Sequence, residues 1–600
     1  MICLDKDAYK NAQRRDTIFT THGAGRVGVS GAWTALLLAS AMTLTACGGG
    51  GSSSSTTTPP VVVAPPPAAA GDIPASTEAA RFLAQSTFGP APEDIAHLTT
   101  VGYGAWLDEQ FAMPLISHQA VIDEVLKTRR AQPYDFYPSF WKQAATGPDQ
   151  LRQRVKFALS EIFVISLSDP NVAAFPRGAA SYYDMLGAGA FGNFRALLEN
   201  VTLHPMMGLY LTSLHNSKET PNRTPDENFA REVMQLFTIG LYQLNQDGSV
   251  KTDAQGPIPT YGLDDITNAA RVYTGFSWAG PDQTDARFNG TGKADPNRDI
   301  TPMQAYPQWH STAAKSFLGV TIPAGSSDAR ADLKIALDTL FNHPNTGPFI
   351  GRQLIQRLVT SNPSPAYISR VAAAFADNGA GVRGDMKAII SAVLLDPEAR
   401  SASGLADPAF GKVREPVVRL AQWMHTFKAT SQLGTWYLRD TSDPEASLGQ
   451  SALTAPTVFN FFRPGYAPPG SDLAAANLVA PELQVLDETS VIGYGNYMQR
   501  VVQRGVGASG PPNTGPADVI ASGYESLLPL AADATQLVDQ IDLLLTAHTL
   551  SASDKRTIID ATNTVALTST DAVKLAQAKL TRVQLAVYLT MLAPSYLVQK

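Results

Sequence analysis

The sequence predicts a mainly α-helical fold, a large multi-helix globular domain with long loops and at most a small β-hairpin, and it leaves a division into two lobes open. Apolar residues recur at helical spacing in many segments, for example between Leu151 and Ile162. Several segments begin with the proline or acidic residues that favour helix starts, as at Pro92. Alternating apolar and polar residues, which would indicate half-buried strands, are rare.

Composition places the chain among globular proteins and excludes several classes of function. Of the 600 residues, 44% are hydrophobic and 16% are charged, a balance that can bury a core. The net charge of −7 offers no basic surface, so we expect no nucleic-acid partner. The two cysteines, Cys3 and Cys47, cannot form a disulfide framework or a cysteine-based zinc site.

Residues 1–46 have the pattern of a lipoprotein signal peptide. An uncharged apolar run, 28–46, follows the positive charge of Arg26. It ends in Leu-Thr-Ala-Cys, which resembles the bacterial lipobox and implies cleavage before Cys47 and lipidation of that residue. The alternative is a transmembrane anchor, for which the run is only marginally long enough.

Residues 47–75 are typical of a flexible tether. Glycine and serine, then proline and alanine, dominate this stretch, and such a composition cannot bury a core. The lipobox resemblance therefore implies an exported protein, lipid-anchored to the cell envelope, whose globular part stands off the membrane. Because Gly48 rather than aspartate follows the cysteine, the resemblance implies the outer membrane.

From residue 76 to 600 we expect one α-helical domain. Segments 193–215 and 332–359 each contain a His-Pro pair that should break them into two helices. Residues 245–262 hold an Asp-Gly turn that favours one hairpin. The other expected helical segments are 76–89, capped by Ser76 or Thr77, then 90–102, 149–168, 368–377, 384–400 and 529–598. The long loops are 280–312 and 441–475, and 280–330 would join two lobes.

The segment "RTPDENFAREVMQLFTIGL", residues 223–241, predicts an amphipathic helix with a very polar face. Thr224 is placed to cap this helix, Pro225 to take its first position and Glu227 to complete a capping box. At about 100° per residue, the apolar side chains share one side. Two polar rows line the other side at four-residue spacing: Glu227, Arg231 and Gln235, and beside them Asn228 and Glu232.

Several ordered motifs resemble the bacterial family called "domain of unknown function 1800". The segment "PDENFAREVMQLFTIGL" (225–241) is similar to the family's most recognisable signature, and "WHSTAAKSFLG" (309–319) is similar to its His-Asp-x-Gly-x-Lys stretch. The other matching segments are 79–111, 191–211, 266–278, "FIGRQLIQRLV" and "GKVREPVVRLAQW". The resemblance covers about residues 78–500, and beyond that more weakly. It implies a cell-envelope setting, but no mechanism and no catalytic residues.

The chain departs from the family pattern at three polar positions. Asp226 stands where the family has asparagine, and Gln235 replaces the second glutamate of the helix. Ser311 stands where an aspartate follows the family histidine. If either missing carboxylate were indispensable, this member would be impaired.

Three interpretations of the polar rows stay open. They can form an internal ion-pair network, or they can be the solvated face of a helix. In the functional interpretation they line a polar cleft, where Glu232 is a general base or ligand and Arg231 clamps an anion. Glu227 and Asn228 would then belong to the same catalytic set.

His215 and His310 are the histidines that such a site would recruit. His215 ends a helix shortly before the signature, and His310 lies in a long loop near Lys315. Imidazole and carboxylate together suit zinc or iron, so His215, His310 and Glu232 would hold a divalent metal. No HxH or HxxxH pair supports this hypothesis, and the sequence identifies no other cofactor.

Two hypotheses for the function follow. The first is a binding or assembly role, with an envelope protein or a polymer as the ligand. The second is an envelope hydrolase that uses carboxylate and histidine residues, with or without a metal ion. The first predicts polar rows that are paired inside the fold, whereas the second predicts that Glu232, Arg231 and a histidine converge in a cleft.

Overall fold

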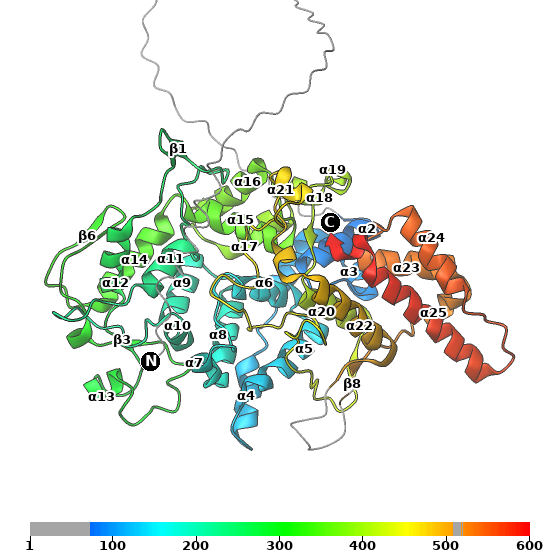
Figure 1. The fold of residues 1–600 in the computed structure, drawn as a ribbon, viewed down its shortest axis with the longest axis horizontal. Coiled ribbons are helices and arrows are strands. Elements are labelled where there is room, and N and C mark those ends of the chain that lie inside the picture. Colours follow the sequence, from blue (N-terminus) through cyan, green and yellow to red (C-terminus); the bar gives the residue numbers. More distant parts are fainter. Residues whose placement is uncertain (1–72, 508–517, 519) are drawn as a thin grey trace, which may run out of the picture. The chain divides into compact units, whose positions relative to one another are not determined.

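The computed structural model describes residues 73–507, 518 and 520–600 of the chain (Figure 1). All of these residues fall within one unit of the chain, Val63–Lys600. The predicted signal peptide, the predicted lipidation site Cys47 and most of the tether lie outside the described residues. None of the described helices combines the length and the apolarity needed to cross a membrane.

The predicted mainly α-helical fold is confirmed, since the described residues contain 25 α-helices and strands of only two or three residues. The first ten, blue to green in Figure 1, are α2 Ser76–Ser86, α3 Pro92–Ala112, α4 His118–Leu126, α5 Phe136–Thr146, α6 Gln150–Ser160, α7 Pro170–Ala173, α8 Pro176–Gly189, α9 Phe194–Leu203, α10 Pro205–Tyr210 and α11 Asn228–Gln235.

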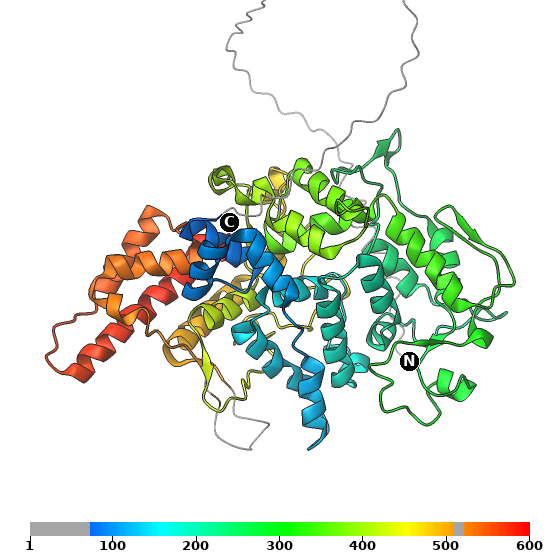
Figure 2. The same cartoon turned by 180° about the vertical axis from the view of Figure 1, so that it is seen from behind.

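The remaining helices complete the same unit. Those of the middle of the chain are α12 Leu263–Val272, α13 Asp285–Phe288, α14 Ala329–Asn342, α15 Thr346–Leu358, α16 Pro365–Ala376, α17 Met386–Leu394, α18 Pro397–Arg400, α19 Ala402–Ala406 and α20 Pro416–Thr426. Those of the last part are α21 Asp472–Ala475, α22 Glu488–Arg504, α23 Ala534–Thr546, α24 Ala552–Asn563, α25 Ala572–Leu592 and α26 Pro594–Leu597. Short 3₁₀ helices are η2 Pro133–Asp135, η3 Pro307–Trp309, η4 Pro481–Val485 and η5 Leu528–Ala532. Helix α2 packs against α23, so the first and last helical regions meet (Figure 2).

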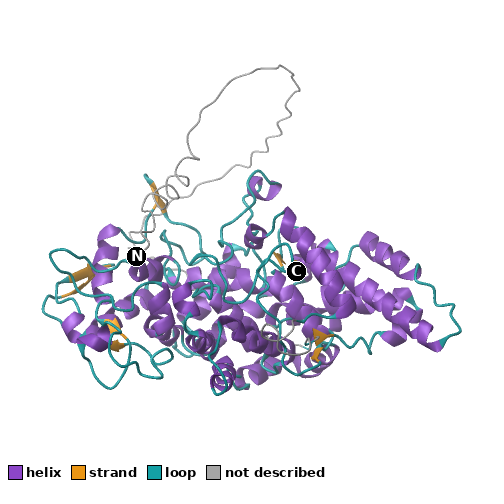
Figure 3. Ribbon diagram, turned by 60° about the horizontal axis from the view of Figure 1, so that its bottom comes forward, coloured by secondary structure: helices purple, strands orange, loops and turns teal. Residues whose placement is uncertain are grey.

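Strands occur in the described residues as five antiparallel pairs, visible as short orange arrows in Figure 3. The pairs are β1 Thr252–Asp253 with β2 Gly256–Pro257, β3 Phe276–Ser277 with β4 Gln304–Ala305, β5 Lys315–Phe317 with β6 Val320–Ile322, β7 Lys412–Val413 with β10 Val598–Gln599, and β8 Thr430–Ser431 with β9 Ile520–Ala521. The predicted hairpin region holds β1 and β2, and Leu244 bridges Val250 across the Asp-Gly turn. Three other pairs join distant segments, which local turn signals do not reveal.

Both predicted His-Pro breaks are confirmed. Helix α9 ends before His204 and α10 begins at Pro205, whereas His343 and Pro344 lie between the end of α14 and the start of α15. At the first break, His204 Nδ1 accepts a hydrogen bond from the backbone N–H of Met206 at 3.3 Å. The imidazole thus satisfies a donor that the first turn of α10 leaves free, which is the role of an N-cap.

The ends of several helices differ from the prediction, and α2 and α6 are examples. The N-cap of α2 is Ala75, and no side chain caps it, so the predicted cap by Ser76 or Thr77 is wrong. Helix α6 ends at Ser160 rather than continuing to residue 168. Beyond it the chain makes contacts with a distant segment instead: the N–H of Leu167 donates to the carbonyl of Leu453 at 2.7 Å.

Helix α6 lies in the core, and every one of its residues is buried. Three of them are the charged residues Arg152, Arg154 and Lys156. It packs against α8, α15, α2 and α3. Charged groups inside a core need partners there, because burial without them is costly. Helix α6 therefore brings a polar network into the interior of the fold.

Candidate functional site

The signature helix α11 begins later than the sequence predicts. Its first residue is Asn228 and its N-cap is Glu227, whose side chain makes no capping bond, so the predicted capping box with Thr224 is wrong. The preceding turn is held by Asn216. Its side chain accepts from the N–H of Asp226 at 2.9 Å and donates to the carbonyl of Asp226 at 3.0 Å. These two bonds hold the backbone of Asp226 in the turn. Helix α11 therefore begins only after this turn, at Asn228.

Glu227 and Arg231 form bonds within the fold. Glu227 Oε1 accepts a hydrogen bond from Thr267 Oγ1 of α12 at 2.8 Å. Its other oxygen, Oε2, lies 3.4 Å from Arg231 Nη2. A partly exposed pair at this spacing contributes only about 0.3–0.5 kcal/mol. The bond to Thr267 has the clearer role, because it ties α11 to the helix against which it packs.

Asn228 contacts the turn that follows α10. Its Nδ2 donates to Thr212 Oγ1 at 3.4 Å, a long bond at an exposed position. Thr212 has a positive φ of 59°, which marks the turn between α10 and the signature loop. Asn228 therefore lies at a junction of elements, as Glu227 does.

Glu232 differs from the other residues of the polar rows because it is buried, with 4% of its surface exposed. Its Oε2 has no hydrogen-bond partner among the described residues. Burial raises the pKa of Glu232 to about 7, against a smaller lowering by Arg231. A carboxyl group that titrates near neutral pH has the property that general acids and bases need, although buried structural carboxyls share it.

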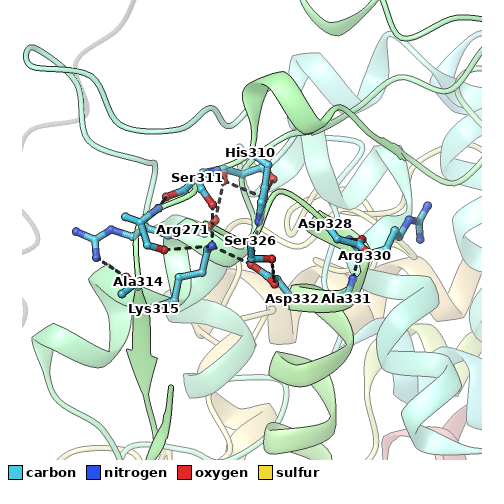
Figure 4. A network of polar contacts seen from close by, with 12 residues as sticks. Arg271, His310, Ser311, Ala314, Lys315, Ser326, Asp328, Arg330, Ala331 and Asp332 are labelled. Carbon is cyan, nitrogen blue, oxygen red and sulfur yellow. Dashed lines mark hydrogen bonds and ion pairs between the residues drawn. The ribbon is translucent and has the colours of Figure 1, made fainter. Parts of the chain in front are cut away.

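His310 is buried in a network with Lys315 and Asp332 (Figure 4). Its Nε2 lies 3.1 Å from Asp332 Oδ2, and its Nδ1 lies 2.8 Å from the carbonyl oxygen of Thr274. Lys315 Nζ lies 2.8 Å from the same Asp332 oxygen. Burial raises the pKa of Asp332, but the bonds from Lys315, His310 and Ser326 outweigh it and hold that pKa below its ordinary value.

The same network fixes the loop before β5. Lys315 Nζ donates to the carbonyl of Ser311 at 2.7 Å, and Ser326 Oγ donates to Asp332 Oδ1 at 2.7 Å (Figure 4). Ser311 stands where the family has aspartate, and its hydroxyl donates to Glu219 Oε1 at 2.9 Å. A carboxylate is thus present near this position, but a different residue supplies it.

His215 has surroundings of its own. Its ring lies 6.2 Å from that of Trp278 and 5.9 Å from that of Phe288, measured between centroids. Its Nε2 is buried and has no hydrogen-bond partner among the described residues. Burial, and then the charge of Arg298, lower the pKa of His215. The ring of His310 faces Asp332 and Thr274 instead, so the two histidines do not share a set of partners.

The proposed metal set is therefore not brought together by any contact described above. In the part of the chain that the structure describes, no group of three or more histidine, cysteine, aspartate or glutamate side chains is arranged to hold a metal ion.

A second polar cluster, which the sequence analysis missed, lies in the core around Lys412. Lys412 Nζ lies 3.1 Å from Glu482 Oε1 and 3.4 Å from Glu415 Oε1, and it donates to the carbonyl of Arg357 at 3.0 Å. We call this group the interior cluster; each member is at most 3% exposed, and its members are Arg154, Glu161, Arg357, Lys412, Glu415, Gln450 and Glu482. A sequence signal for it exists, since Glu161 interrupts the apolar run "FALSEIFVIS".

A surface pocket of about 320 Å³ opens beside the hairpin region. Its walls come from the hairpin, the start of α15, the end of α16 and the loop after α16. The residues that line it include two cations and two amides but no carboxylate; they are Leu244, Asn245, Gln246, Lys251, Pro344, Gly347, Pro348, Ala372, Ala376 and Arg383.

Comparison with models of known protein families identifies the family of the chain. Residues 81–598 match the family described as "Protein of unknown function (DUF1800)". The match includes the region after residue 500, where the motif resemblance is weaker. No curated protein and no solved structure matches the chain.

Proposed function

Because the chain belongs to the DUF1800 family, whose description assigns no activity, we propose from its own residues that it is a lipid-anchored envelope protein with a binding or assembly role. The anchor is the lipidated Cys47, and residues 48–75 are the tether. A Gly/Ser/Pro/Ala-rich segment of that length would let the globular part reach ligands beyond the membrane surface.

The observation that carries the binding role is the pocket beside the hairpin region. Arg383 presents a fixed positive charge there: Nε donates to the carbonyl of Phe341 at 3.0 Å and Nη2 to that of His343 at 3.3 Å. Its guanidinium also lies 5.0 Å from the ring centre of Phe375. Lys251, on the hairpin side, is exposed and can adjust to a ligand.

The lining of this pocket favours an anionic, hydrogen-bonding ligand. Lys251 and Arg383 supply charge, Asn245 and Gln246 supply amide donors and acceptors, and Pro348 supplies an apolar wall. Carboxylate-bearing envelope polymers have this chemistry, and a small part of such a polymer fits a pocket of this size. The ligand class we propose is therefore an anionic polymer of the envelope.

The internal bonds of the signature agree with this assignment. Glu227 ties α11 to α12, and His310, Lys315 and Asp332 form one closed network. These side chains hold elements of the fold together and need no substrate to explain their placement.

The binding role is tested by titrating soluble, carboxylate-bearing peptidoglycan fragments into the purified chain and measuring the heat of binding. We expect wild type and Lys293→Glu, a charge reversal at another exposed lysine, to bind alike. Lys251→Glu should bind at least about tenfold more weakly, because a like charge replaces an attractive one. Equal binding by all three, or none, would overturn the assignment of the pocket.

The anchor is tested separately by fractionating cells that produce wild type or Cys47→Ala. Wild type should sediment with membranes and incorporate labelled fatty acid, whereas Cys47→Ala should do neither. A membrane-bound Cys47→Ala would contradict lipidation at that residue and would support the transmembrane alternative.

One observation favours the second candidate, a hydrolase. The buried Glu232, with a pKa raised to about 7 and an unpartnered Oε2, is suited to proton transfer at neutral pH. The test compares hydrolysis of envelope polymer fragments by wild type and by Glu232→Gln. If wild type cleaves the fragments and Glu232→Gln does not, although its melting temperature is unchanged, the result would favour this function over binding alone.

A further inference from the structure

Glu161 is a buried carboxyl group without a donor. Neither of its oxygens receives a hydrogen bond from a donor group of the described residues. The closest cation is Arg357, whose Nε lies 3.7 Å from Glu161 Oε2, too far for a hydrogen bond. An ionised carboxylate in this position would lack the hydrogen bonds that a buried charge requires.

The carboxyl group of Glu161 lies beside that of Glu415, which is its main electrostatic neighbour. Two adjacent carboxylates would repel each other if both were ionised, and both would be acceptors only, so one of them carries a proton. Glu415 is the better site for the negative charge. Its Oε2 accepts from Gln450 at 2.9 Å, and Lys412 lies 3.4 Å from its Oε1.

We propose that the interior cluster is a proton-binding site, in which Glu161 is a neutral carboxylic acid that donates to the ionised carboxylate of Glu415. Five elements surround the pair with charged or titratable groups. These groups are Arg154 from α6, Tyr183 from α8, Arg357 from α15, Lys412 from β7 and Glu482 from η4. The ligand of the site is thus a proton, held away from solvent.

The electrostatics of the pair agree with this geometry. Burial, and then the charge and hydrogen bond of Glu415, raise the pKa of Glu161 well above its ordinary value. Burial alone would raise the pKa of Glu415 too, but Lys412, Glu161 and Arg154 lower it to about 2. A shared proton between two adjacent carboxyl groups, with their pKa values driven apart, is the expected behaviour of such a pair.

The consequence is a stability that depends on pH. Since the pKa of Glu161 is higher in the folded chain than in the unfolded chain, its contribution is fully present below the unfolded pKa of about 4.5. That contribution is lost as the pH rises through the folded pKa. Glu161→Gln removes this loss, because its amide can still donate to Glu415 and does not titrate.

The test compares Glu161→Gln with Glu415→Gln in the purified full-length chain, with the exposed Glu124→Gln as the control. Infrared spectra of each protein at pH 8 report the carbonyl stretch of a neutral carboxylic acid. Melting temperatures report stability. We expect the band to be present in wild type and Glu124→Gln and absent in Glu161→Gln. The melting temperature of Glu161→Gln should stay within about 2 °C of wild type, whereas that of Glu415→Gln should fall by more than that.

Two results would overturn the proposal. One is an acid band of unchanged intensity in Glu161→Gln, which would place the proton elsewhere. The other is a loss of stability in Glu161→Gln as large as that in Glu415→Gln, which would mean that Glu161 is ionised and paired. If Glu415→Gln fails to fold, the spectra of wild type, Glu161→Gln and Glu124→Gln still decide the question.

Discussion

Lys315 Nζ lies 2.8 Å from Asp332 Oδ2, and both side chains are shielded from solvent. The same aspartate oxygen lies 3.1 Å from His310 Nε2, so one carboxylate holds a lysine and a histidine together. The motif of residues 309–319 therefore forms a structural clamp between β5 and α14.

Removing the buried lysine should cost far more than removing an exposed one. Lys315→Met leaves the Asp332 charge short of a partner, and we expect a loss of about 3–5 kcal/mol in the free energy of unfolding. The control is Lys334→Met, which breaks the exposed pair between Lys334 Nζ and Asp338 Oδ2. That change should cost within about 0.5 kcal/mol. Denaturant unfolding of both variants checks the difference, and similar losses would contradict a clamp.

Gly275 should not tolerate a side chain. Its φ is +76°, and an added Cβ would lie 2.8 Å from the backbone nitrogen of His310. Gly319 has a similar φ of +80°, but a Cβ there meets nothing within 4 Å. We expect Gly319→Ala to cost about 1–2 kcal/mol from backbone conformation alone. Gly275→Ala should cost about 1–3 kcal/mol more because the His310 loop must move. Equal melting temperatures for the two variants would show that this loop is not tightly packed.

Replacing Asn216 should lower the stability of the fold more than replacing an exposed asparagine. Asn216→Ala removes both hydrogen bonds to the backbone of Asp226, and we expect a loss of about 1–3 kcal/mol. Asn289→Ala, at an exposed position where the side chain donates to the carbonyl of Asp285, is the matched control and should have a small effect. Hydrogen exchange of α11 should quicken in Asn216→Ala alone. Unchanged exchange of α11 would mean that the turn before α11 keeps its conformation without the two hydrogen bonds of Asn216.

Glu232 should make stability fall with rising pH. Its pKa is raised from an ordinary value of 4.5 to about 7 in the folded chain. Its contribution is therefore fully present below about pH 4.5 and is lost as the pH rises through 7, a change of roughly 3 kcal/mol. Melting temperatures of wild type and Glu232→Gln, followed from pH 4 to 8.5, should differ in slope in this window. Parallel curves would mean that Glu232 finds a partner for its charge.

Local signals predicted the helices well. Pro92 begins α3, and the His-Pro pairs at residues 204 and 343 separate helices as expected. Such features depend on neighbours in the sequence, where capping and proline geometry act. The cap of α11 was mispredicted because a residue outside the helix, Asn216, engages the turn before it.

The candidate site was harder to predict, because its contacts are long-range. Helical spacing placed Glu232 on a polar face beside Glu227, but packing against other elements buries the first and leaves the second partly exposed. Glu161 and Glu415 come from distant segments, and only tertiary structure brings their carboxyl groups together. A charge inside an apolar run, as at Glu161, is the one local sign of such a pair.

The binding role and the hydrolase alternative place the ligand on different parts of the fold. Hydrogen–deuterium exchange of the full-length chain, with and without carboxylate-bearing peptidoglycan fragments, locates it directly. We expect slower exchange in peptides covering 244–251, 344–348 and 372–383, with α11 unchanged. Slower exchange confined to 227–235, together with cleavage of the fragments, would contradict it and assign the function to Glu232.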